Sequence, residues 1–275
     1  MQKRILAIHD ISCYGRCSLT VALPIISASG AECTVLPTAV LSTHTGGFTG
    51  FTFTDLTGDL MKIAEHWKSE NVHFDYIYTG YLGSFEQIDI VENIIKMNPD
   101  AKVVIDPVMG DHGKLYGAFN KEFALGMAKL CRLADVVMPN VTEASFMTGC
   151  EYREIPFSRD YVNGVLESVL SLGCKCAILT GVAYNDGMLG SAVLCDGKYS
   201  YAEEEKVNGM YHGTGDVFGS ALVGALAAGK DIEKANEIAV KYTRETIRRK
   251  YEEGSDYRNG VPFESCLSYY IDLLK

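Results

Sequence analysis

The sequence predicts an α/β fold in which a central, mostly parallel sheet is flanked by helices on both faces. Short apolar runs typical of buried strands alternate along the chain with longer stretches of helical spacing. The alternation then gives way to an antiparallel hairpin pattern, Leu189–Cys195 and Tyr199–Glu204 joined by the turn Asp196-Gly197, which we place at one edge of the sheet. No low-complexity linker or internal repeat interrupts these patterns, so we expect residues 1–275 to form a single three-layer domain.

Each expected element has its own signal in the sequence. The apolar runs predict strands at Ile5–Ile8, Cys33–Leu41, Tyr76–Tyr78, Lys102–Asp106, Asp135–Met138 and Cys176–Thr180. Apolar residues three or four positions apart, as in Leu56, Leu60, Ile63 and Trp67, predict helices at Leu19–Ala28, Asp55–Lys68, Gln87–Lys96, Lys121–Cys131, Glu143–Met147, Tyr161–Leu172, the run after Asp216, and Glu233–Glu252. Because ligands of such sheets collect at the carboxyl ends of the strands, the polar residues there are the candidates for function.

Composition and charge exclude several classes of protein. Hydrophobic residues make up 47% of the chain, charged residues 22%, and the formal net charge is -10. This acidity argues against a general nucleic-acid binder and against attraction to an anionic membrane. No apolar run approaches the ~18 residues that span a bilayer, and the run Ile5–Ile8 is too short for a signal peptide. We therefore expect a cytoplasmic protein without nucleic-acid or membrane partners.

The nine cysteines are scattered, and their number is odd. Cys13 with Cys17, and Cys174 with Cys176, have no matching second pair at zinc-site spacing. Free thiols in a reducing cytoplasm, acting as small hydrophobic residues, are the expected state.

The segment Gly213-Thr214-Gly215-Asp216 precedes a run of small apolar residues that reads as a helix. Glycines before a helix allow backbone N–H groups to face an anion, and the helix start favours negative charge. Asp216 would stand beside that anion as a base. This combination suits the transfer of a phosphoryl group to a hydroxyl.

The motif resembles that of the ribokinase-like small-molecule kinases, and the rest of the chain resembles the vitamin B6 kinases within that superfamily. The resemblance rests on the order and spacing of the segments His44-Thr45-Gly46, Thr79-Gly80-Tyr81, Asp106-Pro107-Val108-Met109-Gly110-Asp111, Pro139-Asn140 with Glu143, and Gly213 to Asp216. It covers nearly the whole chain and implies a ribokinase-like fold. The lid strands of the sugar kinases are missing from the sequence.

The resemblance also implies roles for these residues. Asp216 would be the catalytic base, and Gly213, Thr214 and Gly215 would form the anion hole. Asp10, His44, Thr45, Tyr81 and Asp216 would contact the vitamer. The ATP phosphates would lie near Asp106, Asp111, Asn140, Glu143 and Thr180.

The cofactors and assembly follow from the same resemblance. It implies ATP and Mg²⁺, with the metal near Asp106 and Glu143 and held mainly through water. It leaves open a requirement for K⁺, and it implies a homodimer. The activity implied is ATP-dependent phosphorylation of the 5′-hydroxymethyl group of pyridoxal, pyridoxine or pyridoxamine, in salvage of pyridoxal 5′-phosphate.

Several of these residues also have a structural interpretation that the sequence leaves open. Asn140 with Glu143 is a standard helix start, in which the two side chains cap the helix. Tyr81 would serve equally as core packing, Asp106 as the end of a strand, and His44 as a hydrogen-bonded loop residue.

Asp10 departs from the family pattern, which usually has Ser at the end of the first strand. We expect Ser12, two residues later, to face a different direction. Asp10 would accept a hydrogen bond from a ring hydroxyl, a protonated ring nitrogen or an amine, which would favour the cationic pyridoxamine.

Two other functions compete with the vitamin B6 kinase. Hydroxymethylpyrimidine (phosphate) kinase of thiamine synthesis shares the fold and chemistry. However, its glycine-rich stretch after the first strand is replaced here by Ser12-Cys13-Tyr14-Gly15. A non-catalytic protein that binds a vitamer is the second alternative, and the intact Asp216 argues against it.

Overall fold

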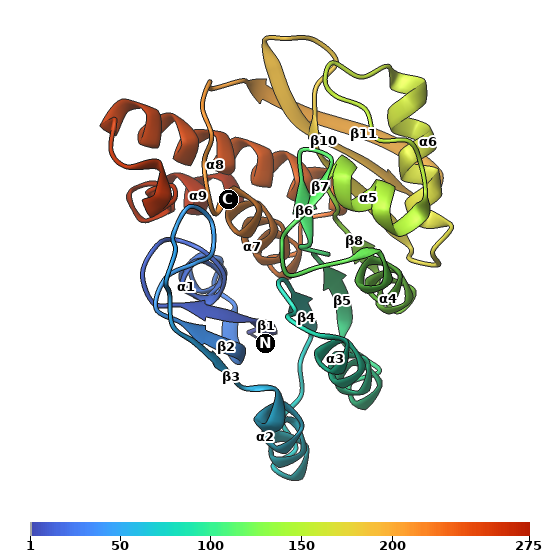
Figure 1. Cartoon of the computed structure of the whole chain (residues 1–275), viewed down its shortest axis with the longest axis vertical. Coiled ribbons are helices and arrows are strands. Elements are labelled where there is room, and N and C mark those ends of the chain that lie inside the picture. Colours follow the sequence, from blue (N-terminus) through green and yellow to red (C-terminus); the bar gives the residue numbers. More distant parts are fainter. Residues whose placement is uncertain (1) are drawn as a thin grey trace. The chain divides into compact units, whose positions relative to one another are not determined.

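The computed structural model describes residues 2–275, and the chain divides into two compact units (Figure 1). Unit 1 comprises the described residues up to Tyr78 together with Val207–Lys275, and unit 2 is Thr79–Lys206. The first and last parts of the sequence thus share one unit.

Unit 1 contains strands and helices from both ends of the chain. Its elements are β1 (Arg4–Ser12), α1 (Leu19–Ala28), β2 (Glu32–Leu41), β3 (Phe53–Asp55), α2 (Thr57–Ser69), β4 (Tyr76–Thr79, whose last residue belongs to unit 2), α7 (Thr214–Ala227), α8 (Ile232–Glu253), the 3-10 turns η1 (Tyr257–Asn259) and η2 (Phe263–Cys266), and α9 (Leu267–Leu274). β1 pairs in parallel with β2, and β3 pairs antiparallel with β2.

Unit 2 contains the middle of the chain. Its elements are α3 (Phe85–Met97), β5 (Lys102–Ile105), β6 (Gly110–Asp111), β7 (Lys114–Leu115), α4 (Lys121–Cys131), β8 (Val136–Val137), α5 (Val141–Thr148), α6 (Arg159–Leu170), β9 (Cys176–Val182), β10 (Met188–Cys195) and β11 (Lys198–Glu205). β8 pairs in parallel with β5 and β9, whereas β10 is antiparallel to both β9 and β11.

The strands follow the hydrogen-bonded order β11-β10-β9-β8-β5-β4-β1-β2-β3, a nine-stranded mixed sheet. β6 and β7 form a separate hairpin. This confirms the predicted α/β class, the mostly parallel sheet and the antiparallel hairpin at one edge.

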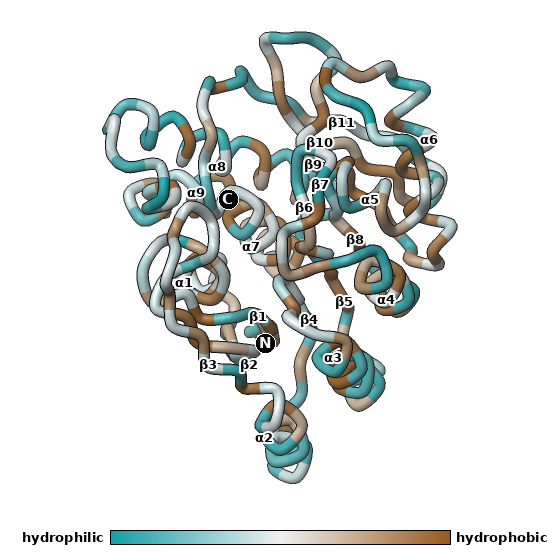
Figure 2. Tube along the Cα trace, in the orientation of Figure 1, coloured by the Kyte–Doolittle hydropathy of each residue, from teal (hydrophilic) through white to brown (hydrophobic). Residues whose placement is uncertain are grey.

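The interior of β1 explains why the chain forms a sheet covered on both faces. Ile5, Leu6, Ala7 and Ile8 are all fully buried, so consecutive side chains on opposite faces of the strand are shielded. Figure 2 shows helices such as α3 and α8 with both hydrophobic and hydrophilic turns, as expected for helices with one face on a core.

The small residues of α7 allow close helix packing in unit 1. A Cβ at Gly224 would lie 2.4 Å from the Tyr270 hydroxyl of α9. That hydroxyl donates to the Ala221 carbonyl at 2.9 Å. The apolar run after Asp216 is therefore a buried helix, as predicted.

The predicted boundaries of α1 and α4 match the structure, and those of most other helices differ by one to three residues. The short strand β3, the β6–β7 hairpin and α9 were not predicted. Asp55 ends β3, so the helix predicted from Asp55 begins at Thr57 instead. A three-residue strand carries too little periodicity to be recognised in the sequence.

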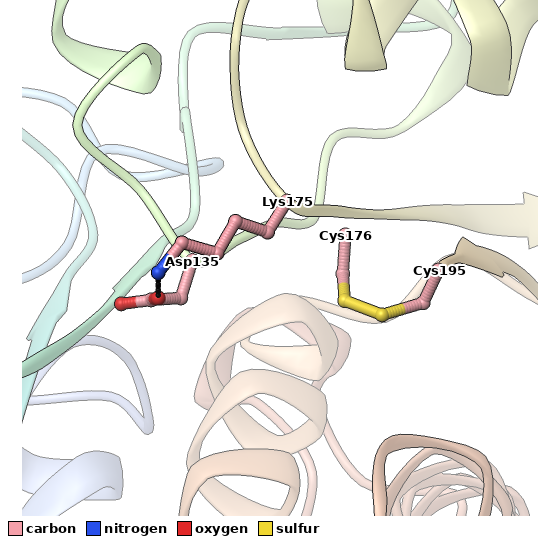
Figure 3. The surroundings of a disulfide bond; sticks show 4 residues. All are labelled: Asp135, Lys175, Cys176 and Cys195. Atoms are coloured by element: carbon pink, nitrogen blue, oxygen red, sulfur yellow. Dashed lines mark hydrogen bonds and ion pairs between the residues drawn. A yellow bond between two sulfur atoms is a disulfide. The ribbon is translucent and has the colours of Figure 1, made fainter. Parts of the chain in front are cut away.

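The expectation that all nine cysteines are free thiols is wrong. A disulfide joins Cys176 of β9 to Cys195 of β10, with a Cα–Cα separation of 4.4 Å (Figure 3). The two residues lie directly opposite in the antiparallel register, where side chains approach most closely. The pairing depends on register, which the separation of 19 residues along the chain does not reveal.

Across residues 2–275, every helix is too short or too polar to cross a membrane.

Candidate active site

In unit 1, the segment Gly213-Thr214-Gly215-Asp216 forms the start of α7. Gly213 has a φ of 76°, in the left-handed region that favours glycine. A Cβ there would lie 2.0 Å from the Arg16 carbonyl oxygen, so a side chain is excluded by space as well. The first backbone bond of the helix runs from Val217 N–H to the Gly213 carbonyl. The N–H groups of residues 214–216 precede that bond and have the arrangement of an anion cradle.

Asp216 lies in the first turn of α7, and its side chain is partly shielded from solvent. Burial raises its pKa from 3.8 to about 7, and the charge of Asp10 adds to the rise, while an interaction with the Ser18 backbone opposes it. A carboxylate with a pKa near neutrality can accept and release a proton at working pH. Asp216 thus has the properties of a general base.

Asp10 is buried near the end of β1, where the pairing with β2 is irregular between His9 and Ile11. The Ser18 hydroxyl donates to one carboxylate oxygen at 2.6 Å, and the Ser12 hydroxyl donates to the other at 3.0 Å. Burial raises the pKa of Asp10, and the two hydroxyls act in the opposite direction.

The expectation that Ser12 faces away from Asp10 is wrong. Residues two apart in a strand point to the same face, and the structure brings the two side chains into hydrogen-bond contact. Ser12 therefore belongs to the surroundings of Asp10.

Two further neighbours of the carboxylates were missed in the sequence. Ser18 precedes α1 with a φ of 59°, its hydroxyl contacts Asp10, and its backbone contacts Asp216. Burial, followed by the charges of Asp216 and Asp10, raises the pKa of the Cys17 thiol well above its usual value. A protonated thiol is a poor nucleophile, so Cys17 is a packing residue here. The preference of Ser for helix N-termini was the only signal of Ser18 in the sequence.

His44 is buried in the loop after β2, and both of its ring nitrogens are engaged with backbone. Nδ1 accepts the Gly46 N–H at 3.1 Å, so Nε2 carries the proton and donates to the Arg258 carbonyl at 2.6 Å. A contact between His44 and the vitamer stays a prediction. The two hydrogen bonds favour the interpretation of His44 as a loop residue that is held in place by the backbone. The neighbouring Thr45 is exposed.

In unit 2, the predicted strand-end residues surround Asn140. Its side-chain NH₂ donates to the Gly110 carbonyl at 2.8 Å, and Asn140 forms an isolated parallel bridge with Thr180. The Thr180 N–H donates to the Pro139 carbonyl at 3.0 Å. The structure thus brings the Gly110 turn, the Asn140 segment and Thr180 together.

Asn140 and Glu143 form a capping box at the start of α5. The Glu143 carboxylate accepts N–H groups from Asn140 (2.9 Å) and Met109 (3.1 Å), which confirms the structural interpretation of this pair. Burial raises the pKa of Glu143, and Asp111 raises it further, while the backbone N–H bonds oppose the shift. Capping leaves room for a second role in supporting a metal.

Asp106 and Asp111 differ in exposure. Asp106 is buried after β5, with its N–H donating to the Thr79 carbonyl at 2.9 Å. The side chain of Asp111, in the β6–β7 hairpin, is 54% exposed, and it accepts the His112 N–H at 2.8 Å. Asp111 is the more accessible of the two to a ligand.

Tyr81 is partly exposed and contacts Phe119, with ring centroids 5.4 Å apart. Phe119 in turn stacks on Phe123 at 4.3 Å. The ring of Tyr81 is therefore supported on one side by an aromatic cluster, which is compatible with both packing and ring stacking on a ligand.

The carboxylates of unit 2 fit a water-bridged Mg²⁺. Within the described part of the chain, no cluster of three or more His, Cys, Asp or Glu side chains is placed to hold a metal directly. Mg²⁺ usually keeps several waters and uses one or two carboxylates together with substrate phosphates. Asp111 and Glu143 interact electrostatically, and their carboxylate oxygens are of the kind that such a site uses.

Comparison with known proteins shows which family this chain resembles. Residues 23–260 match the family model described as phosphomethylpyrimidine kinase. The pyridoxal kinase of Dictyostelium discoideum is 27% identical over 291 residues, covering 98% of this chain and 92% of that protein.

Solved structures resemble the chain along nearly its whole length. A candidate phosphomethylpyrimidine kinase from Bacteroides thetaiotaomicron, crystallised with pyridoxal, has a TM-score of 0.91 and 38% identity, and covers 98% of this chain and 96% of its own. Pyridoxal kinase from Lactobacillus plantarum has a TM-score of 0.92 and 29% identity, with coverage of 99% and 98%. Leishmania donovani pyridoxal kinase, in complex with ADP and pyridoxamine, has a TM-score of 0.87 and 22% identity, with coverage of 98% and 96%, and supports the fold alone.

Proposed function

Because the chain belongs to the phosphomethylpyrimidine kinase family, within which similar proteins are pyridoxal kinases, we propose that it is an ATP-dependent kinase of vitamin B6 vitamers. The phosphoryl group goes to the 5′-hydroxymethyl oxygen of pyridoxal, pyridoxine or pyridoxamine. The observation that carries this proposal is Asp216, a carboxylate with a pKa near 7 at a helix start, next to N–H groups that precede the first backbone bond of the helix.

Asp216 takes the proton of the attacking hydroxyl as the oxygen bonds to the γ-phosphorus, and the bond between that phosphorus and the β–γ bridging oxygen breaks to release ADP. The anion hole of Gly213, Thr214 and Gly215 receives the negative charge of the transferred oxygens through backbone N–H groups. Partial burial of Asp216 raises its pKa, so its carboxylate is basic enough to accept that proton. The carboxylate of a fully solvated aspartate has a lower pKa and is a weaker base.

The ATP phosphates lie near Asp106, Asp111, Asn140, Glu143 and Thr180 in this proposal, and the three carboxylates act on them through a cation rather than by direct contact. Asp106 and Glu143 would hold Mg²⁺ through water, and the cation would neutralise phosphate charge there. The acidic residues position that cation, while Asn140 fixes the backbone of the turns around it.

The vitamer ring is assigned to Asp10, Thr45 and Tyr81, with His44 beside them. The preference for pyridoxamine rests on Asp10, since a cationic amine stabilises an ionised, buried carboxylate. We also propose that residues 1–275 act as one kinase domain and that the protein assembles as a homodimer in the cytoplasm. A requirement for K⁺ is to be measured in the same activity assay. Whole-length similarity to pyridoxal kinases supports the single domain.

Hydroxymethylpyrimidine (phosphate) kinase is the second candidate, favoured by the description of the matching family model. The pyridoxal bound to the Bacteroides relative favours the B6 vitamers. ADP release with Mg-ATP and each of pyridoxal, pyridoxine, pyridoxamine and hydroxymethylpyrimidine separates the two.

The same assay in Asp216→Asn tests the mechanism. Turnover of a vitamer that falls by about 10²–10⁴ in this variant supports the kinase. Turnover of the pyrimidine alone assigns the protein to thiamine synthesis. Vitamer binding without turnover would identify a binding protein instead.

A further inference from the structure

The segment Gly15–Ser18, which links β1 to α1, lies against His44, Gly213 and the two carboxylates of the candidate site in unit 1. A Cβ at Gly15 would lie 2.3 Å from the His44 ring, and the Arg16 carbonyl excludes a Cβ at Gly213. Arg16 also forms an ion pair with Glu264 at 2.9 Å, which ties the segment to the C-terminal turns. The segment is therefore fixed on several sides.

Ser18 ends this segment and touches both carboxylates. Its hydroxyl donates to Asp10 at 2.6 Å, and its backbone interacts with the Asp216 carboxylate. Its φ of 59° is unusual for a residue other than glycine, asparagine or aspartate, and an isolated antiparallel bridge to Ile11 helps to hold it. Its side chain makes no capping bond to α1, so the usual reason for Ser at this place does not apply.

We propose that Ser18 is a positioning residue for the phosphoryl-transfer step, which orients the Asp216 base through its backbone and keeps Asp10 ionised through its hydroxyl. The proposal rests on the proposed function for its kinetic meaning. The left-handed backbone directs the N–H to Asp216 while the side chain reaches Asp10, and so Ser18 connects the two carboxylates.

The electrostatic consequence has a definite sign. A hydroxyl that donates to a carboxylate stabilises its charged form, so removing it raises the pKa of Asp10. A less charged Asp10 repels the Asp216 carboxylate less, and the pKa of Asp216 falls. The other titratable groups that act on the two carboxylates are the Cys17 thiol, which stays protonated, and His44, which lowers the pKa of Asp10.

The test uses Ser18→Ala, Ser18→Gly and the control Ser84→Ala. Both Ser18 variants keep the backbone N–H and lose the hydroxyl, and glycine also removes the strain of the positive φ. Ser84 is the capping serine of α3 and contacts the Gln87 N–H instead of a carboxylate. The control therefore reports what the loss of a structural serine does by itself.

In both Ser18 variants we expect kcat/KM to fall about tenfold and its acid limb to move about one pH unit lower. In an Asp10→Ser background, Ser18→Ala should leave the acid limb where it is, because no carboxylate remains for the hydroxyl to stabilise. An acid limb that stays in place in both Ser18 variants, or that moves as far in Ser84→Ala, overturns the proposal.

A direct titration separates this inference from the kinase assignment. Carbon-13 NMR of the aspartate carboxyls needs no turnover, and in Ser18→Ala it should show a higher pKa for Asp10 and a lower one for Asp216. Unchanged carboxyl pKa values would overturn the role of Ser18 while the kinase assignment stands. Changed values without turnover of any vitamer would retain the coupling and remove the proposed function.

Discussion

Replacement of Asp216 by asparagine should lower activity and raise stability at the same time. The side chains are nearly the same size, so the variant removes the charge and the basicity with little change in packing. Burial raises the pKa of Asp216 in the folded protein. At a pH where this carboxylate is ionised in the folded state, its charge therefore lowers the free energy of unfolding.

The magnitude follows from the two pKa values. Below pH 3.8 the carboxyl is protonated in both the folded and unfolded states, and it has no effect on the free energy of unfolding. Between pH 3.8 and about 7 the unfolded state has already lost the proton and the folded state keeps it, so stability falls with rising pH. At about 1.4 kcal/mol per unit, the two units from pH 5 to pH 7 correspond to about 2–3 kcal/mol.

Urea denaturation of the wild type and Asp216→Asn at pH 5 and pH 8 measures this difference. We expect the stability advantage of the variant to grow by about 2–3 kcal/mol between the two values, while kcat falls by about 10²–10⁴. In the wild type, kcat/KM should fall about tenfold per pH unit below pH 7, since only the ionised carboxylate accepts a proton. A variant equally stable relative to wild type at both pH values, together with a flat pH profile, would refute the buried-base argument.

Two other substitutions test the surroundings of the site. Gly213→Ala places a Cβ against the Arg16 carbonyl at a positive φ, so it should lower the free energy of unfolding by at least about 1–2 kcal/mol and remove most of the activity. Gly229 has a φ of 88° and nothing within 4 Å of the position that a Cβ would take, so Gly229→Ala should lose only the stability that the backbone strain takes, as urea denaturation would show. Glu143→Ala should lower the free energy of unfolding by about 1–3 kcal/mol because it leaves two N–H groups unpaired, and a smaller loss would contradict the capping role. Glu143→Gln keeps one acceptor oxygen but turns its NH₂ toward the second N–H, so its free energy of unfolding should fall by about 1–3 kcal/mol. The Mg²⁺ concentration for half-maximal turnover of this variant should rise about tenfold, and an unchanged Mg²⁺ requirement would leave the residue with its structural role alone.

The sequence predicted the fold well because the fold depends on local periodicity. α1 and α4 were predicted at their observed limits, since each has apolar residues at helical spacing and a clear end. The β10–β11 hairpin was predicted from its turn and its alternation of apolar and polar residues. Its two strands pair without interruption from Met188 opposite Glu205 to Cys195 opposite Lys198. The turn between the two-residue strands β6 and β7 has a hydrogen bond from the Gly113 N–H to the Thr142 hydroxyl, and no local pattern contains a contact between residues 29 positions apart.

The sequence predicted the helix starts at which several candidate site residues lie, but not the contacts among those residues. Asp216, Asn140 and Glu143 were found because glycine and capping patterns mark helix starts. Ser18 was missed because its partner Asp10 lies eight residues away and its conformation depends on a positive φ. The Cys176–Cys195 bond was missed for a similar reason, since it depends on strand register.

Asp10 links the strength of the base to the choice of substrate. Its charge is one of the causes that raise the pKa of Asp216, so the residue at this position acts on proton transfer even where it does not touch the hydroxyl. Asp10→Ser removes that charge and should lower the pKa of Asp216, although burial, the larger cause, keeps it above 3.8. The acid limb of kcat/KM should then move to lower pH, and the preference among the three vitamers should shift away from pyridoxamine. A ranking that is unchanged while the acid limb moves would confine Asp10 to tuning the base, and an acid limb that stays in place would show that burial alone sets the basicity of Asp216.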